Sequence, residues 1–195
     1  MRKSEVKRKT KETEIVCSIN LEGVGNTNVN TGIGFFDLML EFFSHHSLID
    51  LDLKAIGDTH VDLHHTVEDT GYVIAQTIIN SLGDKRGIKR YGFFYVPMDE
   101  CLSRCVIDFS GRPELVLKID LGLEKIGEMD TELFYEFFKA FVNESKCNLH
   151  IQNIYGNNHH HIIESCFKSF ARSIRLAVEV DQRIINRIPS SKGTL

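Results

Sequence analysis

The sequence has no apolar run long enough to span a membrane, and its first eleven residues are charged rather than hydrophobic. We therefore expect neither a transmembrane helix nor a secretory signal. An excess of positive charge is also missing, because 23 Lys and Arg face 27 Asp and Glu. This balance gives no indication of nucleic-acid binding over the whole surface. A basic cluster at residues 3–11 is better explained by a solvated first strand or a frayed tail than by a site for an anionic partner.

Paired cysteines are missing as well. The five cysteines form no C-x-x-C pair, and their number is odd. Reduced thiols in a cytoplasmic protein explain this usage best, so we expect a cytoplasmic location. Cys101 and Cys105 have a ligand-like spacing, but they lie in an alternating apolar stretch. We interpret them as strand residues that face a core.

The apolar residues predict two similar α+β halves. With 195 residues, 42% of them hydrophobic, the chain fits one compact unit or two small halves that share a core. Alternating stretches predict strands at residues 14–21, 26–31, 48–56, 90–97, 101–109, 115–121 and 149–155. Helical spacing predicts helices at residues 35–44, 64–82 and 132–142, and a last helix that begins near residue 160. The order of strands, helix, strand and helix occurs twice, which indicates an internal duplication with repeats at about residues 5–90 and 91–186 and a tail at residues 187–195.

One motif stands at corresponding places in the two halves. Two adjacent histidines are followed three residues later by a glutamate, at His64-His65-Thr66-Val67-Glu68 and at His160-His161-Ile162-Ile163-Glu164. The copies are 96 residues apart, and each leads into an apolar stretch with helical spacing. We interpret both as metal-binding ends of helices. The alternative is two helix starts with polar caps and a buried imidazole or two.

The spacing within the motif indicates two ions rather than one. Residues three or four apart share a face of a helix, so either histidine can share an ion with the glutamate. Adjacent residues point about 100° apart, so the two histidines of one pair cannot easily bind the same ion. We therefore expect each ion to take one imidazole from each copy. Imidazole with carboxylate suits zinc, manganese and iron better than calcium or magnesium.

Several cationic and hydroxyl side chains are candidates for a phosphate site. Arg90 begins a predicted strand, and Arg112 lies in a Gly-Arg-Pro turn that limits its directions. Lys168 is four residues beyond Glu164 on the same helical face, and Ser191 and Lys192 lie in the polar tail. Arginine binds phosphate through paired donors and lysine as a point charge. Taken singly, each of these residues is explained as well by a solvated surface.

Six short segments, distributed from the first strand to the last residues, carry a resemblance to a known family. They are RKTKET at residues 8–13, NTGIGFFD at 30–37, HHTVED at 64–69, DFSGRP at 108–113, NHHHIIE at 158–164 and PSSKG at 189–193. With these segments in this order, essentially the whole sequence resembles the imidazoleglycerol-phosphate dehydratases. The resemblance implies a hydro-lyase of histidine biosynthesis that converts imidazole glycerol phosphate to imidazole acetol phosphate.

The resemblance also implies a fold and an assembly. The fold is α+β, with two similar halves that are each a four-stranded sheet backed by helices, like the second domain of ribosomal protein S5. The assembly is an octahedral shell of 24 copies, a homo-oligomer with two manganese ions per site at contacts between subunits. No nucleic acid and no membrane take part. The substrate is a small phosphorylated imidazole.

The resemblance assigns roles to residues of this chain. The implied metal ligands are His64, His65, Glu68, Glu136, His160, His161 and Glu164. The implied catalytic carboxylates are Glu12, Glu68 and Glu164. The implied substrate contacts are Glu12, His46, Arg90, Arg112, Lys168, Ser190, Ser191 and Lys192.

Three positions depart from the family pattern. Leu38 stands where the family usually has a metal-binding histidine, and Glu136 stands where it often has histidine. Leu63 replaces a usual acidic residue before the first histidine pair. A carboxylate can still coordinate a metal, but leucine cannot. The departures leave open a non-catalytic or impaired paralogue that forms a metal-cemented shell. A metal-dependent hydrolase of a phosphorylated metabolite is a further alternative, although the sequence has no H-E-x-x-H pattern.

We predict that the purified protein holds fewer than two tightly bound metal ions per subunit, because Leu38 offers no ligand. Leu38→His should raise both the metal content and the activity. Elemental analysis of the assembled protein measures the metal content. Two tightly held ions per subunit in the protein with Leu38 would contradict the prediction, and high activity with Leu38 in place would exclude the non-catalytic paralogue.

Overall fold

The computed structural model describes residues 2–122 and 124–195. The strands of the first half are β1 (Lys3–Lys9), β2 (Thr13–Asn20), β3 (Thr27–Asn30) and β4 (Asp50–Gly57). They form one sheet in the order β1-β2-β4-β3, in which β3 is parallel to β4 and the other pairs are antiparallel. The basic cluster near the N-terminus therefore lies largely on β1, whose side chains alternate between exposed and half-buried. Of the two explanations, the solvated first strand is correct.

The second half repeats this arrangement. Its strands are β5 (Tyr91–Met98), β6 (Cys101–Asp108), β7 (Glu114–Lys118) and β10 (Asn148–Tyr155), in the order β5-β6-β10-β7. Here too the strand at the far edge, β7, is parallel to its neighbour and the other pairs are antiparallel. The two sheets confirm the α+β fold with two similar halves that the sequence predicted.

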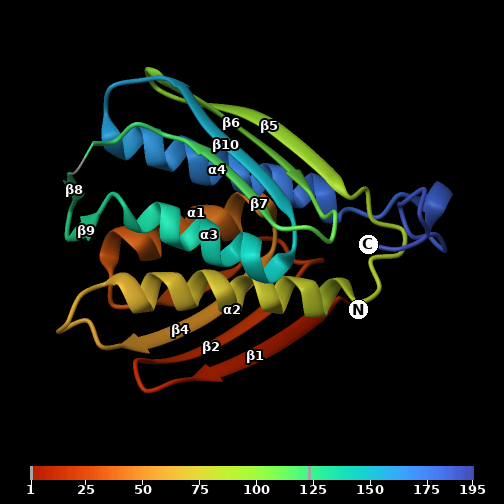
Figure 1. Cartoon of the computed structure of the whole chain (residues 1–195), viewed down its shortest axis with the longest axis horizontal. Helices are drawn as coiled ribbons and strands as arrows, with labels where there is room; N and C mark the ends of the chain where they lie inside the picture. The colour runs from red at the N-terminus through yellow and green to blue at the C-terminus, as the bar shows by residue number, and fades with distance from the viewer. Residues whose placement is uncertain (1, 123) are drawn as a thin grey trace.

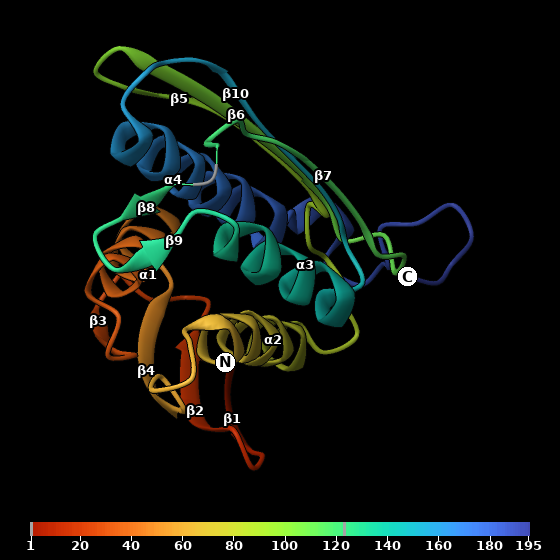
Figure 2. The ribbon, with the colours of Figure 1, turned by 60° about the vertical axis from the view of Figure 1, so that its left-hand side comes forward.

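Four helices fill the space between the sheets (Figure 1). They are α1 (Gly34–Ser47), α2 (His64–Leu82), α3 (Leu133–Ser145) and α4 (His159–Val178). Helix α2 covers β1 and β2, and α4 covers β5 and β6. Each of these long helices also packs against the short helix of the other half, α2 against α3 and α4 against α1. Figure 2 shows the two sheets on the outside with the helices between them, so the halves share one core.

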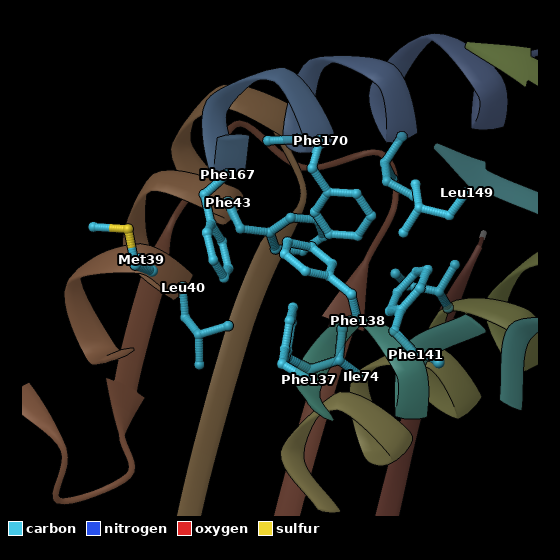
Figure 3. Close-up of a cluster of buried hydrophobic side chains, with 14 of the residues drawn as sticks. Met39, Leu40, Phe43, Ile74, Phe137, Phe138, Phe141, Leu149, Phe167 and Phe170 are labelled. Carbon is cyan, nitrogen blue, oxygen red and sulfur yellow. The ribbon is translucent and has the colours of Figure 1, made fainter. Parts of the chain in front are cut away.

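Aromatic side chains form the centre of this core (Figure 3). The apolar stripe predicted on α3 is buried, and Phe138 and Phe141 meet α4 at Phe167 and Phe170. Phe43 of α1 stacks on Phe170 with ring centroids 5.5 Å apart. Buried aromatic pairs stabilise a core through their large apolar area and through their preferred ring geometry. These contacts join α1, α3 and α4 and therefore fix the two halves relative to each other.

The cysteines behave as core residues. All five thiols are free and buried, and Cys101 and Cys105 lie on the inward face of β6, as the alternating pattern predicted. None of the helices in the described parts of the chain is long and apolar enough to cross a membrane.

Some element boundaries differ from the sequence prediction. Leu48 does not begin a strand, because it ends α1 in a left-handed conformation with φ 59°. Arg90 likewise lies before β5, with φ 71°, and β7 ends at Lys118 rather than near residue 121. A small hairpin of β8 (Lys125–Ile126) and β9 (Met129–Asp130) was not predicted, because two-residue strands carry no periodic signal.

The contact between α2 and α3 gives a prediction about Gly71. A Cβ on Gly71 would lie 2.5 Å from the carbonyl oxygen of Phe137 and 3.2 Å from its ring. Because backbone cannot move aside cheaply in a packed core, we expect Gly71→Ala to lower the free energy of unfolding by about 1–3 kcal/mol. Gly34→Ala is the matched control, since a Cβ there meets no atom within 4 Å. Urea unfolding of both variants measures the effect, and equal stability of the two would contradict this packing.

Candidate active site

The first histidine pair opens α2 and divides between two sets of carboxylates. His64 faces along the helix, with its Nε2 3.7 Å from Oε2 of Glu68. His65 turns away from the helix towards the sheet. Its Nδ1 lies 3.0 Å from Oδ2 of Asp58, just after β4, and its Nε2 lies 3.9 Å from Oε1 of Glu12, in the turn between β1 and β2. The divergence of adjacent residues on a helix thus sends the two imidazoles to different partners, as the sequence predicted.

The second pair opens α4 with the same division. His160 lies with its Nε2 3.3 Å from Oε2 of Glu164. His161 turns towards the tip of the β5–β6 hairpin, where Oε2 of Glu100 lies 2.8 Å from its Nδ1 and Asp99 lies 3.7 Å from its Nε2. The side chain of Asn158 caps the helix by accepting the backbone N–H of His161. The two copies of the motif therefore share their side-chain directions as well as their spacing.

Charge at the site shifts the protonation of these histidines. The carboxylate of Asp58 raises the pKa of His65, and that of Glu100 raises the pKa of His161, in both cases mainly through the hydrogen bond to the ring. His161 in turn holds the pKa of Glu100 well below its usual range, with help from the backbone N–H of Asn158. Burial lowers the pKa of His46, and the positive charge of Lys168 lowers it further.

Lys168 contacts the second motif, and its side chain is largely buried. Its ammonium is 2.5 Å from Oε1 of Glu164, and it lies 5.0 Å from the ring centre of Phe42. Glu164 is only 7% exposed, whereas Glu68 at the corresponding place is 48% exposed. The buried carboxylate of Glu164 thus has both a cation and an imidazole as partners, which is what burying a charge requires.

Arg90 is tied to the strand and to the tail. Its guanidinium binds both oxygens of Asp108, at 2.6 and 3.1 Å, and donates to the carbonyl oxygen of Pro189. Its left-handed backbone conformation is uncommon for a residue with a side chain and marks a position held by its surroundings. Arg90, Ser190 and Ser191 line a surface hollow of about 410 Å³. The sequence did not predict the Asp108 partner.

The other candidates lie as follows. Arg112, in the β6–β7 turn, and Lys192, in the tail, are both exposed. Glu136 is half-buried on the first turn of α3. Leu38 is half-buried and packs against the core from α1, and Leu63 stands at the start of α2, where it supplies no side-chain cap.

The candidate residues gather at two opposite ends of the molecule. Both histidine motifs begin their helices at the left of Figure 1, whereas the C-terminal tail lies at the right. The backbone N–H of Arg90 donates to the carbonyl oxygen of Ala177, in the last turn of α4, while His160 lies in the first turn. Because a 20-residue helix is about 30 Å long, Arg90 and His160 cannot serve one small substrate within one chain. Within residues 2–122 and 124–195, no three or more ligating side chains are arranged to hold a metal ion.

Sequence reasoning missed Asp58, Asp99 and Glu100. All three stand in turns, which the sequence marked only as ends of strands. Their proximity to the histidines follows from how each sheet lies against the start of its long helix, and no local pattern encodes that placement. A carboxylate in a turn just before or after a strand was the one available signal.

The His161–Glu100 pair predicts a defined pH dependence for the metal-free fold. In the folded protein the pair is charged between the lowered pKa of Glu100 and the raised pKa of His161. Its contribution to stability is complete between the ordinary pKa values of glutamate and histidine, about 4.3 and 6.5. Its stabilising contribution is lost as the pH falls through the lowered pKa of Glu100, and also as the pH rises through that of His161. We expect the difference in melting temperature between the chelator-treated protein and its His161→Gln variant to be largest inside this window and to shrink above it. A difference that does not change with pH would contradict the pairing.

Comparison with known proteins places the chain in a family. The family model described as imidazoleglycerol-phosphate dehydratase matches residues 31–174. The chain is 52% identical over 194 residues to the imidazoleglycerol-phosphate dehydratase of Hahella chejuensis, covering 100% of this chain and 98% of the relative. It is also 52% identical over 195 residues to that of Rhodopseudomonas palustris, covering 100% and 99%.

Solved structures agree with the sequence comparisons. The crystal structure of imidazoleglycerol-phosphate dehydratase from Staphylococcus aureus superposes with a TM-score of 0.83 at 40% identity and covers 92% of this chain and 99% of that one. The enzyme from Pyrococcus furiosus, in complex with (S)-C348, gives 0.84 at 27% identity and covers 97% and 100%. These matches confirm the resemblance seen in the sequence. The chain belongs to the imidazoleglycerol-phosphate dehydratase family, whose members are hydro-lyases of histidine biosynthesis.

Proposed function

We propose that this dehydratase works at a site formed between subunits, where the two histidine motifs come from different copies of the chain and hold manganese between them. The observation that carries the proposal is the separation within one chain. The second motif lies in the first turns of α4, whereas Arg90, with Ser190 and Ser191 beside it, lies at the last turn, about 25 Å away. A homo-oligomer brings an end of one copy against an end of another, and a shell of 24 copies is the assembly that the family resemblance implies.

The side chains fit a divalent transition metal. Two ligands bound to one ion at about 2.1 Å each lie about 3.0–3.4 Å from each other at tetrahedral or octahedral angles. The separation between His160 and Glu164 is 3.3 Å, and that between His64 and Glu68 is 3.7 Å. Each motif thus presents an imidazole and a carboxylate at nearly the spacing of a chelate. Imidazole with carboxylate is a ligand set for manganese, zinc or iron.

Both motifs are incomplete as metal sites. Each offers its own helical glutamate and two histidines that diverge, and Glu136 adds a half-buried carboxylate from α3. Leu38 adds nothing, because its side chain packs against the core. In this proposal a second chain supplies the further protein ligands. The proposed ligands that lie along the two helices are His64, Glu68, His160 and Glu164. His65 and His161 are ligands on the sides of the helices that face the turns carrying Asp58 and Glu100.

The reaction needs help because the proton to be removed lies on carbon beside an imidazole ring, with no neighbouring carbonyl group to acidify it. Metal bound at the ring nitrogens supplies Lewis-acid stabilisation of the electron-rich ring. The chain's own carboxylates handle the protons. Glu12, half-exposed in the β1–β2 turn and 3.9 Å from His65, is the proposed acid–base group, and Glu68 and Glu164 act both as ligands and as catalytic carboxylates.

The phosphate is proposed to bind at the cationic end of a neighbouring copy. Arg90 has one face of its guanidinium fixed by Asp108, which orients its remaining donors beside the hollow lined by Ser190 and Ser191. Arg112 and Lys192 add positive charge near this end of the fold. Lys168 and His46 belong to the other end, next to Glu164, and are proposed to contact the substrate there.

Turnover of imidazole glycerol phosphate with added manganese tests the proposal. We expect the wild-type protein to form imidazole acetol phosphate and Arg112→Ala to raise KM about tenfold or more, because a charge-assisted phosphate contact is worth about 1.5–3 kcal/mol. Arg183→Ala is the matched control, since Arg183 is exposed and pairs only with Asp181 among the described residues.

The outcomes separate the parts of the proposal. An unchanged KM in Arg112→Ala would remove Arg112 from the phosphate site. No product over a broad range of divalent metals would contradict the proposed manganese-dependent reaction.

A further inference from the structure

The second histidine of each motif has its Nδ1 next to a carboxylate that lies outside the motif. Nδ1 of His65 lies 3.0 and 3.2 Å from the two oxygens of Asp58. Nδ1 of His161 lies 2.8 Å from Oε2 of Glu100. A carboxylate can only accept a hydrogen bond, so in both cases the proton of a neutral imidazole is placed on Nδ1. The lone pair is then on Nε2.

The two carboxylates come from different places in the repeat. Asp58 follows Gly57 at the end of β4, and the corresponding Gly156 at the end of β10 is followed by Asn157, an amide. Glu100 immediately precedes β6, and its counterpart before β2 is Glu12, which lies on the Nε2 side of His65. The two halves therefore reach the same arrangement at Nδ1 by different routes. A contact merely inherited from the duplication would come from the same position in both halves, which is not the case here.

We propose that Asp58 and Glu100 are positioning residues that fix the tautomers of His65 and His161, so that Nε2 of each ring is free to bind metal. The proposal rests on the proposed metal site. Histidine ligands commonly donate their other ring N–H to a carboxylate, and loss of such a partner typically weakens metal binding 10- to 100-fold.

The structure predicts that amide substitutions at the two positions have unequal effects. The other oxygen of Glu100, Oε1, accepts the backbone N–H of Asn158 at 2.9 Å and that of Asn157 at 3.4 Å. A glutamine at this position keeps its carbonyl oxygen on these two donors and turns its NH₂ group towards His161. The ring must then accept at Nδ1 and carry its proton on Nε2, where it blocks the metal.

Asp58 has no such second set of donors. Among the described residues, its carboxylate is hydrogen-bonded only to His65. An asparagine at this position is free to turn its carbonyl oxygen towards Nδ1 of His65 and to preserve the tautomer. The same chemical change, from carboxylate to amide, is therefore damaging at Glu100 and mild at Asp58.

Equilibrium dialysis measures the manganese affinity of the assembled wild type and of each variant. Free Mn²⁺ is detected by electron paramagnetic resonance. We expect Glu100→Gln to weaken binding about 10- to 100-fold, Asp58→Asn to weaken it by less than about threefold, and Asp58→Ala to weaken it about 10-fold or more. The melting temperature of each metal-free variant is measured in parallel.

Two controls separate tautomer from structure. Glu124→Gln removes a carboxylate that lies 2.9 Å from Nδ1 of His159, a histidine outside the repeated motif, and should leave manganese affinity unchanged. Asn158→Ala removes a cap from α4 but leaves Glu100 on His161, so it should lower the melting temperature without weakening manganese binding.

Each outcome decides the matter. If the wild type binds manganese and Glu100→Gln binds it with the same affinity, the positioning roles alone are overturned. Equal losses of affinity in Glu100→Gln and Asp58→Asn would overturn them in the same way. Loss of affinity in Asn158→Ala to the same degree as in Glu100→Gln would show that the effect is structural and would also overturn them. Equal manganese binding by the wild type and His161→Ala would overturn the proposed metal site itself, and the positioning roles with it.

Discussion

The rigid length of α4 is the constraint on which the arrangement of this molecule depends. The helix carries His160, His161 and Glu164 in its first two turns, and its last turn holds the backbone of Arg90. A helix of this length cannot bend enough to bring its ends together. The proposed metal ligands and the proposed phosphate contact Arg90 therefore stand at opposite ends of one copy. Only association of copies can bring them to one substrate, so assembly and activity are coupled in the proposed function.

The cross-packing of helices keeps the two histidine motifs at the same end of the fold. Each long helix rests on its own sheet and on the short helix of the other half (Figure 2). The aromatic contacts of Phe43, Phe138 and Phe141 with α4 fill the space between the halves. Close packing of this kind leaves little freedom for one half to shift against the other. The core thus sets where the imidazoles stand, and Phe35, which packs against it, has its ring centre 5.0 Å from that of His160.

The sequence predicted those features that depend on local periodicity. Alternation along residues 101–108 identified a strand with Cys101 and Cys105 inside, and the phenylalanine spacing after residue 132 identified α3 with its buried stripe. The repeated histidine motif was found because its spacing is a property of the helix alone. The family resemblance identified the enzyme class.

Contacts between elements were beyond local reasoning. Nothing in the order of residues places Glu100 against His161, because that contact depends on how the β5–β6 hairpin lies over the start of α4. The pairing of Arg90 with Asp108 likewise depends on strand register, since Asp108 pairs with Tyr91, the first residue of β5, and Arg90 directly precedes it. The sequence could name the titratable groups at the site, but the partners that set their charge and tautomer appear only in three dimensions.

A subunit-complementation measurement tests the shared site most directly. His64→Ala and His161→Ala are each expected to be inactive, because each removes a ligand from every site. If the motifs of different copies meet, random co-assembly of equal amounts restores both ligands at about a quarter of the sites, and activity returns to about that fraction of wild type. Mixed assemblies that remain as inactive as either variant alone, although the two kinds of subunit are shown to co-assemble, would contradict the account.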